Sequence, residues 1–264
     1  MPPGIFGAYD GSPEHYNPYL FNWDPRRNRA VRKSVEEARA LLAEAGYPNG
    51  RGPDGKPLVI RFDNAWTGAE ARTRIRWIQK RLETIGVVLQ NDTTDYSRFR
   101  DKVRNGNFQM IFWGWIADYP DPENFFFLLY GPNSEVETGG PNHSNYDNPE
   151  FNRLFERMEN MTNTPERLAL IQQMTQIVQQ DAPWVWGYHP ISYTLWHGWV
   201  RNVKPHALFV NAMKYRALDA QLRAQKRAEW NRPNYATPTL LLGLLVLSGV
   251  AAVWLSKGRL RGVR

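Results

Sequence analysis

The stretch FQMIFWGWIADYPDPENFFFLLYG, residues 108–131, joins an apolar run to a loop rich in aromatic residues. The first eight residues are typical of a buried strand. Pro120 and Pro122 then exclude a continuous helix or a central strand, because proline has a fixed φ and no backbone donor. The sequence therefore predicts a strand followed by an aromatic loop, in which Asp118 and Asp121 lie among apolar side chains.

The residues before this stretch alternate between strand and helix patterns. Strands are predicted over 58–63 and 87–92, and helices over 69–85 and 96–106. With the strand that starts at residue 108, the order is strand, helix, strand, helix, strand. This order is typical of an α/β layer, so we predict the α/β fold class.

An earlier helix is predicted over residues 34–46. Ser34 has the chemistry of an N-cap, and Glu37 three residues later completes a capping box. Apolar residues follow at helical spacing, and Gly46 is suited to end the helix.

Further helices are predicted after the aromatic loop, over residues 148–161 and 164–183. Thr164 is the expected N-cap of the second of these helices, with proline at its first position. Two aromatic strands are predicted to follow, over 184–190 and 192–199.

The net charge of +7 is concentrated at the C-terminal end. Nine of the 33 Lys and Arg residues, but only two of the 26 Asp and Glu residues, lie at or after Arg216. The rest of the chain is therefore neutral. A nucleic-acid partner is not expected, because such a partner requires a basic patch on the body.

The C-terminal region also contains a long uncharged stretch, from residue 233 to residue 256. About 20 apolar residues suffice to span a bilayer as a helix. We therefore predict a single membrane-spanning helix over 236–256, with the lipid bilayer as a partner. Basic residues after the span favour a cytoplasmic C-terminus, although basic residues also precede it.

The N-terminus has neither a basic region nor an apolar run, so it does not resemble a signal peptide. Two interpretations follow. Either the body is cytoplasmic on a tail anchor, or the chain lacks a beginning that its relatives have.

No catalytic or metal-binding pattern stands out. The chain has no cysteine, and its five histidines, which include His189 and His197, lack metal-ligand spacing. No hydrolase or metalloprotease motif is present, and Asp118 with Asp121 alone is weak evidence for a glycosidase pair. We predict that the protein is not an enzyme and has no metal or cofactor.

Several unlike motifs together carry a family resemblance. The segments EEARALLAEAGYPNG, FQMIFWGWIADYPDPENFFFLLYG, NYDNPEFNRLFERM and TPERLALIQQMTQIVQQDAPWVWGYHP occur in this order. The order and spacing resemble the peptide-binding proteins of ABC importers, which are the dipeptide and oligopeptide receptors of solute-binding protein family 5. The resemblance covers roughly residues 2–215, and such receptors are normally about twice as long as this chain.

The resemblance implies one lobe of a periplasmic-binding-protein type II fold, from the C-terminal half of such a receptor. Family members close two lobes on their ligand. A C-terminal transmembrane helix is a departure from the family pattern. The predicted divisions are a hinge-like N-terminal segment 1–30, an α/β lobe 31–189, a return segment 190–216, a basic juxtamembrane linker 217–235, the transmembrane helix 236–256 and a basic tail 257–264.

The resemblance also implies a ligand site. In family members with W-x-x-D after the apolar strand, the aspartate accepts the α-ammonium of the bound peptide, and Trp115 to Asp118 match this motif. Trp113 and Tyr119 are the further candidate ligand-binding residues, because aromatic walls exclude water from a cleft. The alternative is that Asp118 only caps the turn at Tyr119. Asp121 is expected to be the N-cap of a helix with Pro122 at its first position.

Two functions remain open. The first is a membrane-anchored, peptide-binding subunit derived from the receptor of an ABC peptide importer. It would bind peptide if a first lobe is supplied, and would work with an ABC permease. The second is an accessory or structural subunit of a larger membrane complex, in which ligand binding is lost. For both, the expected location is the cell membrane with the body on the periplasmic side.

Overall fold

The computed structural model describes residues 1–8, 11, 16–191, 193–203 and 212–261. The chain divides into two compact units, Met1–Pro190 and Ile191–Arg264. The first unit contains the α/β layer and the aromatic loop, and the second contains the C-terminal helices.

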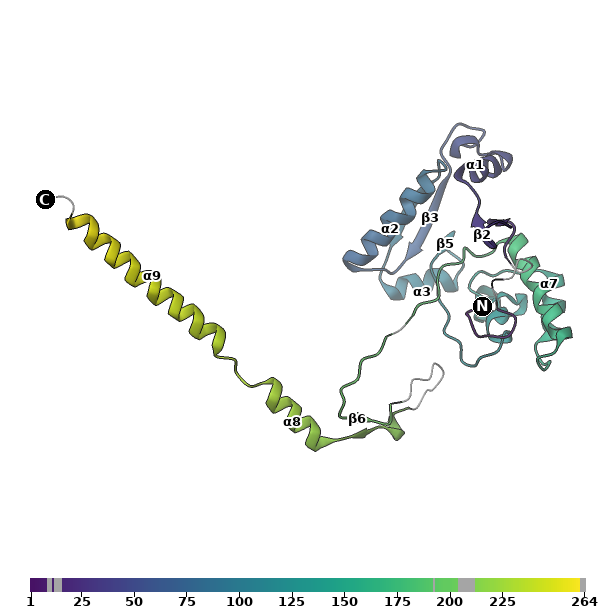
Figure 1. Cartoon of the computed structure of the whole chain (residues 1–264). Helices are drawn as coiled ribbons and strands as arrows, with labels where there is room; N and C mark the ends of the chain where they lie inside the picture. Colours follow the sequence, from purple (N-terminus) through teal and green to yellow (C-terminus); the bar gives the residue numbers. More distant parts are fainter. Residues whose placement is uncertain (9–10, 12–15, 192, 204–211, 262–264) are drawn as a thin grey trace. The chain divides into compact units, whose positions relative to one another are not determined.

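A parallel sheet of three strands is the centre of the first unit (Figure 1). Its strand order is β4 (Val88–Thr93), β3 (Val59–Asn64), β5 (Met110–Ile111). The connections are the helices α2 (Gly68–Glu83) and α3 (Tyr96–Arg104). The predicted strand and helix order is therefore confirmed.

One face of the sheet is covered by α2. Phe62, Leu89 and Ile75 form the core of this contact, and all three are buried. Phe62 lies on β3, Leu89 on β4 and Ile75 on the inward stripe of α2, as an amphipathic α/β packing requires.

Strand β5 is much shorter than the predicted run of eight residues. Only Met110 and Ile111 pair with β3. The chain then leaves the sheet, because Trp113 stacks on Phe99 of α3 and Trp115 turns toward Asn124. The ring contact of Trp113 and the hydrogen bond of Trp115 replace the strand pairing that the apolar pattern predicted.

Two glycines bring the loops before β3 and β4 into direct backbone contact. Gly50 ends a 3₁₀ turn (Pro48–Gly50), and its carbonyl accepts the Leu58 N–H at 2.7 Å. A Cβ atom on Gly50 would lie 2.0 Å from the carbonyl oxygen of Gly86. Both glycines have positive φ, which other residues rarely adopt.

Helix α1 (Val35–Glu44) begins as predicted, with the complete Ser34–Glu37 capping box. It buries none of its residues, however, and Leu41 is 57% exposed. The apolar spacing indicated a helix correctly, but it did not show that this face would be covered.

The helical part of the first unit packs around a second core. Helices α6 (Pro149–Met158) and α7 (Pro165–Asp181) contribute most of its buried side chains, and α4 (Glu123–Phe126) contributes Phe126. Thr164 caps α7 with proline at its first turn, as predicted. The remaining elements of this unit are the hairpin β1 (Phe21–Asp24) and β2 (Arg29–Arg32), the 3₁₀ turns Phe127–Leu129 and Gly131–Asn133, and α5 (Glu135–Thr138).

The predicted aromatic strands over 184–190 and 192–199 are wrong for the described residues. Helix α7 ends at Asp181, and the capping residue Ala182 that follows has a φ of 48°. The chain that follows has no strand assignment until β6 (Val200–Arg201), and residue 192 lies outside the described residues. An aromatic run forms a strand only where a neighbouring strand completes the ladder.

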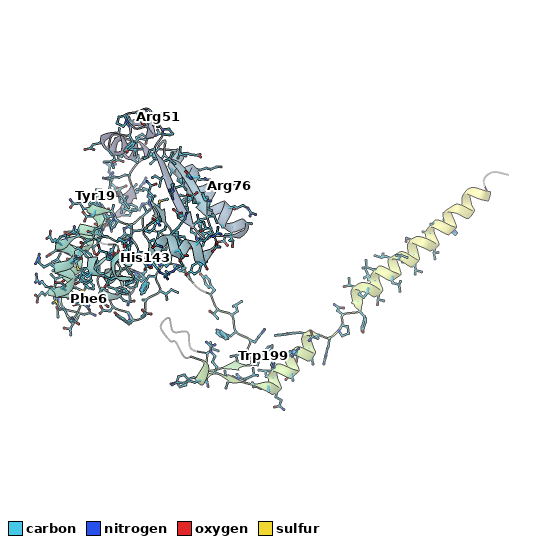
Figure 2. All side chains as sticks on the ribbon, turned by 180° about the vertical axis from the view of Figure 1, so that it is seen from behind. Phe6, Tyr19, Arg51, Arg76, His143 and Trp199 are labelled. Atoms are coloured by element: carbon cyan, nitrogen blue, oxygen red, sulfur yellow. The ribbon has the colours of Figure 1, made fainter. Side chains whose placement is uncertain are left out.

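The second unit contains a short hairpin and two helices. Strand β6 pairs with β7 (Ala217–Leu218), and α8 (Ala220–Trp230) follows with Asp219 as N-cap. Trp199, labelled in Figure 2, is stacked on His197 and lies 5.2 Å from Trp230 between ring centroids. A 3₁₀ turn (Ala212–Tyr215) and the long helix α9 (Ala236–Arg261) complete this unit.

Within the described residues, no helix combines the length and the apolar character needed to cross a membrane. The predicted membrane span over residues 236–256 is therefore not supported.

Candidate functional site

The loop after β5 is organised around one buried amide. Asn124, at the start of α4, is 2% exposed. Its Oδ1 accepts the Trp115 Nε1–H at 3.1 Å and the backbone N–H of Asp118 at 2.9 Å. A buried polar group is stable only when it is hydrogen-bonded, so Asn124 fixes both the indole of Trp115 and the backbone of Asp118.

Trp113 is held by three side chains from other parts of the first unit. Phe99 stacks on it at 5.7 Å, and the edge of His143 approaches it at 4.2 Å between centroids. The guanidinium carbon of Arg100 lies 5.1 Å from the ring centroid, within range of a cation–π interaction. The ring is therefore a rigid part of the loop.

His143 is itself part of a buried charged cluster. Its Nδ1 lies 3.0 Å from a carboxylate oxygen of Glu135, which is 5% exposed, and Arg100 lies 3.8 Å from the other oxygen. Burial lowers the pKa of His143 and Arg100 lowers it further, while Glu135 opposes both effects. The net effect is a pKa below the usual histidine value, and His143 lies within the first unit (Figure 2).

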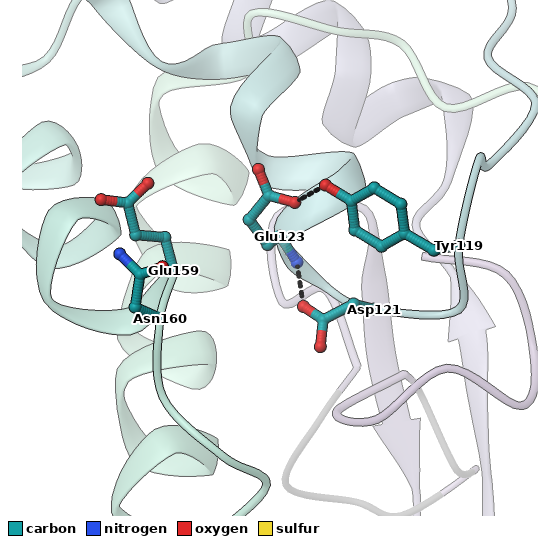
Figure 3. Close-up of a pocket in the computed structure, with 5 residues that line it drawn as sticks. All are labelled: Tyr119, Asp121, Glu123, Glu159 and Asn160. Atoms are coloured by element: carbon teal, nitrogen blue, oxygen red, sulfur yellow. Dashed lines mark hydrogen bonds between the residues drawn. The ribbon is translucent and has the colours of Figure 1, made fainter.

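Tyr119 is at the surface, 44% exposed. Its hydroxyl donates a hydrogen bond to the Glu123 carboxylate, which raises the pKa of Tyr119. Figure 3 shows this pair together with Asp121, Glu159 and Asn160, which line the same hollow. The volume of the hollow is about 390 Å³. Its lining is polar and carries three carboxylates. Among the described residues no cluster of side chains fits a metal ion.

The carboxylate of Asp118 is exposed and has no hydrogen bond or ion pair within the described part of the chain. Only its backbone is fixed, through Asn124. Asp118 therefore does not cap the turn at Tyr119, and its charge remains available to a ligand.

Both carboxylate oxygens of Asp121, three residues later, accept hydrogen bonds. Its two oxygens accept hydrogen bonds from Nη1 and Nη2 of Arg167 at 2.8 and 2.6 Å. Arg167 is 2% exposed and also donates to the carbonyl of Met158 and to Asn163. This bidentate pair connects the aromatic loop to α7.

The helix start differs slightly from the prediction. Pro122 occupies the N-cap position of α4, and Asp121 precedes it. The Asp121 side chain still accepts the Glu123 N–H at 2.9 Å. Burial works against ionisation of Asp121, but the hydrogen bonds from Arg167 and Glu123 outweigh it, so the pKa is lowered.

The model of the family "Bacterial extracellular solute-binding proteins, family 5 Middle" matches residues 1–136 of this chain. This chain belongs to that family. The predicted family resemblance is thereby confirmed, and members of this family are solute-binding proteins, which as a family are not enzymes.

Two relatives of this family 5 protein illustrate how much of each chain is shared. Heme-binding protein A of Haemophilus influenzae is 32% identical over 60% of this chain and 28% of its own length. The periplasmic oligopeptide-binding protein OppA of Escherichia coli is 27% identical over 75% of this chain and 33% of its own. The chain thus spans about a third of these relatives or less.

Solved structures of the same class show the same α/β architecture. HbpA2 from Haemophilus parasuis is 29% identical, with a TM-score of 0.50 over 64% of this chain and 31% of that one. The periplasmic binding protein DppA from Helicobacter pylori, in complex with the peptide STSA, is 26% identical. Its TM-score is 0.51, over 69% of this chain and 31% of that one. The predicted α/β fold class is confirmed by these neighbours.

Three aromatic rings of this family 5 chain form what we call the aromatic ledge: Trp66, Phe112 and Tyr188. The centroid of Phe112 lies 4.9 Å from that of Trp66 and 6.5 Å from that of Tyr188. Trp66 follows β3 and Phe112 follows β5 directly, so both lie at the carboxyl ends of parallel strands. In open α/β sheets, ligands bind outside these strand ends.

The sequence reasoning missed the groups that hold the site together. Asn124 was read only as part of a helix, and the partner of Asp121 was not foreseen, because Arg167 is 46 residues away along the chain. The one local signal was a single amide at the start of an apolar run, NFFFLL. A polar residue in such a run must find a buried partner.

Proposed function

We propose that this chain provides one lobe of a peptide receptor for an ABC importer and works on the periplasmic side of the membrane. Family membership supports a solute-binding role. Among its relatives, OppA of Escherichia coli is named for oligopeptides and the Pseudomonas aeruginosa relatives for di- and tripeptides. An ABC permease is then the partner that would receive the ligand.

Asp118 is the proposed acceptor of the peptide's α-ammonium. The observation that carries this role is its exposed, unpaired carboxylate beside groups that are fixed around it. Trp115 is held by Asn124 and Trp113 by its three neighbours, so both can serve as preformed walls. An ammonium paired with a carboxylate in a water-poor cleft is bound much more strongly than in bulk water.

Tyr119 is proposed to border the ligand. Its ring is exposed while its hydroxyl is occupied by Glu123. It would therefore contribute apolar contact area rather than a hydrogen bond.

A single lobe is expected to bind peptide weakly. A two-lobe receptor covers its ligand from both sides, whereas one lobe leaves half of the peptide in water. Loss of half the contacts would weaken a micromolar site, about −8 kcal/mol, to millimolar or worse. Useful affinity therefore requires a first lobe, supplied by a separate or longer polypeptide.

The test is an NMR titration of the purified chain with millimolar tripeptide, in free and N-acetylated forms. The free peptide should shift the side-chain amide signals of Asn124 and the indole signal of Trp115, and acetylation or Asp118→Asn should remove the effect. Equal shifts from both peptide forms would reject the ammonium role. Absence of peptide binding even with a first lobe added would favour the accessory-subunit alternative.

A further inference from the structure

Trp113 packs against a largely buried cluster of three charged or titratable side chains. Arg100 comes from α3, Glu135 from α5 and His143 from the loop after α5. The side chain of Glu135 is 5% exposed and that of His143 is 13% exposed. The Nδ1 of His143 lies 3.0 Å from one oxygen of Glu135, while a guanidinium nitrogen of Arg100 lies 3.8 Å from the other. One buried carboxylate is therefore shared between two partners.

The contact between His143 and Glu135 is incomplete. The Nδ1 atom of His143 is enclosed by the protein, yet it has no hydrogen-bond partner within the described residues. A neutral imidazole has only one N–H donor, whereas both ring nitrogens donate once the ring is protonated. A protonated His143 can therefore form a charge-assisted hydrogen bond with the carboxylate that already lies beside it.

Protonation of His143 also changes the balance between Glu135 and Arg100. The charged groups that face the ring are Arg100 from α3 and Glu135 from α5. Burial lowers the pKa of His143 most, Glu135 raises it and Arg100 lowers it again. A protonated ring repels Arg100, whose contact with Glu135 is the longer of the two. Glu135 should then pair with His143 at the expense of Arg100.

Both of the cations that compete for Glu135 contact the same indole ring. The guanidinium carbon of Arg100 lies 5.1 Å from the ring centroid of Trp113, and the ring centroid of His143 lies 4.2 Å from it. Phe99, the third neighbour of this indole, carries no charge. A change of charge at His143 therefore reaches Trp113 through two of its three contacts.

We propose that His143 is a pH-sensitive positioning residue for Trp113. When the ring gains a proton in mild acid, Glu135 pairs with His143, Arg100 is released from Glu135, and the packing of Trp113 changes. The consequence for a ligand rests on the proposed function. One wall of the peptide site is fixed at neutral pH and loosened in acid, and the added positive charge opposes the ammonium of the peptide. The lobe then holds its ligand at neutral pH and releases it in acid.

The competing explanation is that His143 only fills space against Trp113. In that case the charge of the imidazole has no effect on the indole. The two roles therefore differ in one measurable property, which is whether the environment of Trp113 follows the protonation of His143.

The experiment follows two NMR signals of the full chain without ligand, the ring C–H signal of His143 and the indole N–H signal of Trp113, between about pH 8 and pH 5. Carboxylates remain largely ionised over this range, because their usual pKa values are about 4. Both signals should change with one common midpoint, below the usual histidine pKa of about 6.5. An indole signal that does not change, or that changes with a different midpoint, would overturn the proposal. Because no ligand is present, this failure is distinct from a failure of the proposed peptide site.

Substitutions of the two charged neighbours should move the midpoint in opposite directions. Arg100→Gln removes a positive charge beside the ring and should raise the midpoint, whereas Glu135→Gln removes a negative charge and should lower it. The Arg100 side chain is 29% exposed, so its substitution remains a test if the buried Glu135→Gln variant does not fold. A midpoint that Arg100→Gln leaves unchanged would contradict the exchange of partners at Glu135.

Substitutions of the histidines provide the matched control. His143→Gln should abolish the pH response of the Trp113 indole over this range. His189→Gln should retain the response, although burial also lowers the pKa of His189. A response that persists in His143→Gln, or that disappears in His189→Gln, would assign the pH dependence to another group and overturn the proposal. The titration of the unmodified chain tests the proposal even if neither variant folds.

Discussion

Asp118 and Asp121 lie in the same loop among the same aromatic residues, yet they are used in opposite ways. Asp121 is joined to the buried Arg167 by two hydrogen bonds, while the carboxylate of Asp118 has no partner among the described residues. Their local sequences are similar, since each lies close to a proline. The difference shows that a carboxylate in an apolar loop is structural only where a distant cation meets it.

Removal of the Asp121 carboxylate should have the largest effect on stability. Asp121→Ala leaves the guanidinium of Arg167 buried without its ion partner, and this typically costs about 3–5 kcal/mol. We expect about 3 kcal/mol, because the Asp121 side chain is itself 30% exposed. Urea denaturation followed by circular dichroism measures this loss.

The matched control is Asp118→Ala in the same assay. A loss of similar size from both substitutions would mean that the two carboxylates do not differ as the structure indicates.

Removal of the Asn124 side-chain amide should have the next largest effect. In Asn124→Ala, the indole N–H of Trp115 and the N–H of Asp118 lose their acceptor. Leaving such donors unsatisfied costs about 1–3 kcal/mol, and we expect about 2 kcal/mol by urea denaturation. Asn124→Asp retains an acceptor oxygen and should be less harmful; if it destabilises as much as alanine, the hydrogen bonds are not the cause.

A smaller effect is expected from acidic pH. The lowered pKa of Asp121 means that its contribution to stability is complete above its unfolded pKa and is lost as the pH falls through its folded pKa. The window therefore lies below about pH 4. Solvent screening of this partly exposed carboxylate keeps the effect below that of either substitution.

The measurement compares urea denaturation of the unmodified chain and Asp121→Asn between about pH 5 and pH 2.5, a range that spans the unfolded aspartate pKa of about 3.9. Other carboxylates affect both proteins equally, so the gap in stability between the two should narrow toward low pH. A constant gap would show that Asp121 does not titrate in this range.

The smallest effect on stability is predicted for Asp118→Asn. Its side chain makes no contact that the substitution removes, so the free energy of unfolding should change by no more than about 0.5 kcal/mol. Thermal unfolding of the two proteins side by side checks this expectation. A clear loss of stability would indicate a structural role and weaken the proposed ligand role.

Local signals in the sequence predicted most elements of the first unit. The Ser34–Glu37 capping box and the Thr164 cap both form, because capping depends only on residues within one turn. The parallel sheet also followed from the alternation of patterns. The length of β5 could not be predicted, since it depends on where Trp113 and Trp115 find distant partners.

Of the candidate site, only the residues of the family motif could be predicted from the sequence. Asp118 and Trp115 were indicated by the family motif, and their role as ligand-binding residues stays a prediction. Asn124 and Arg167 act through contacts that fold the chain back on itself, and periodicity contains no information on such pairs. The exposure of the apolar face of α1 could not be predicted for the same reason. The spacing of apolar residues indicates a stripe on the helix, but it does not indicate which element covers that stripe.

The contact between Gly50 and Gly86 has a consequence for how this protein can vary. Any side chain at Gly50 would collide with the carbonyl of Gly86, and a side chain at Gly86 would collide with the backbone of Asn49. A library that randomises these two positions should return almost only glycine, whereas position 118, beyond the carboxyl ends of the strands, should accept many residues because its side chain is exposed. Selection for new ligands can therefore act on the carboxyl ends of the strands while the amino ends keep the strand register unchanged.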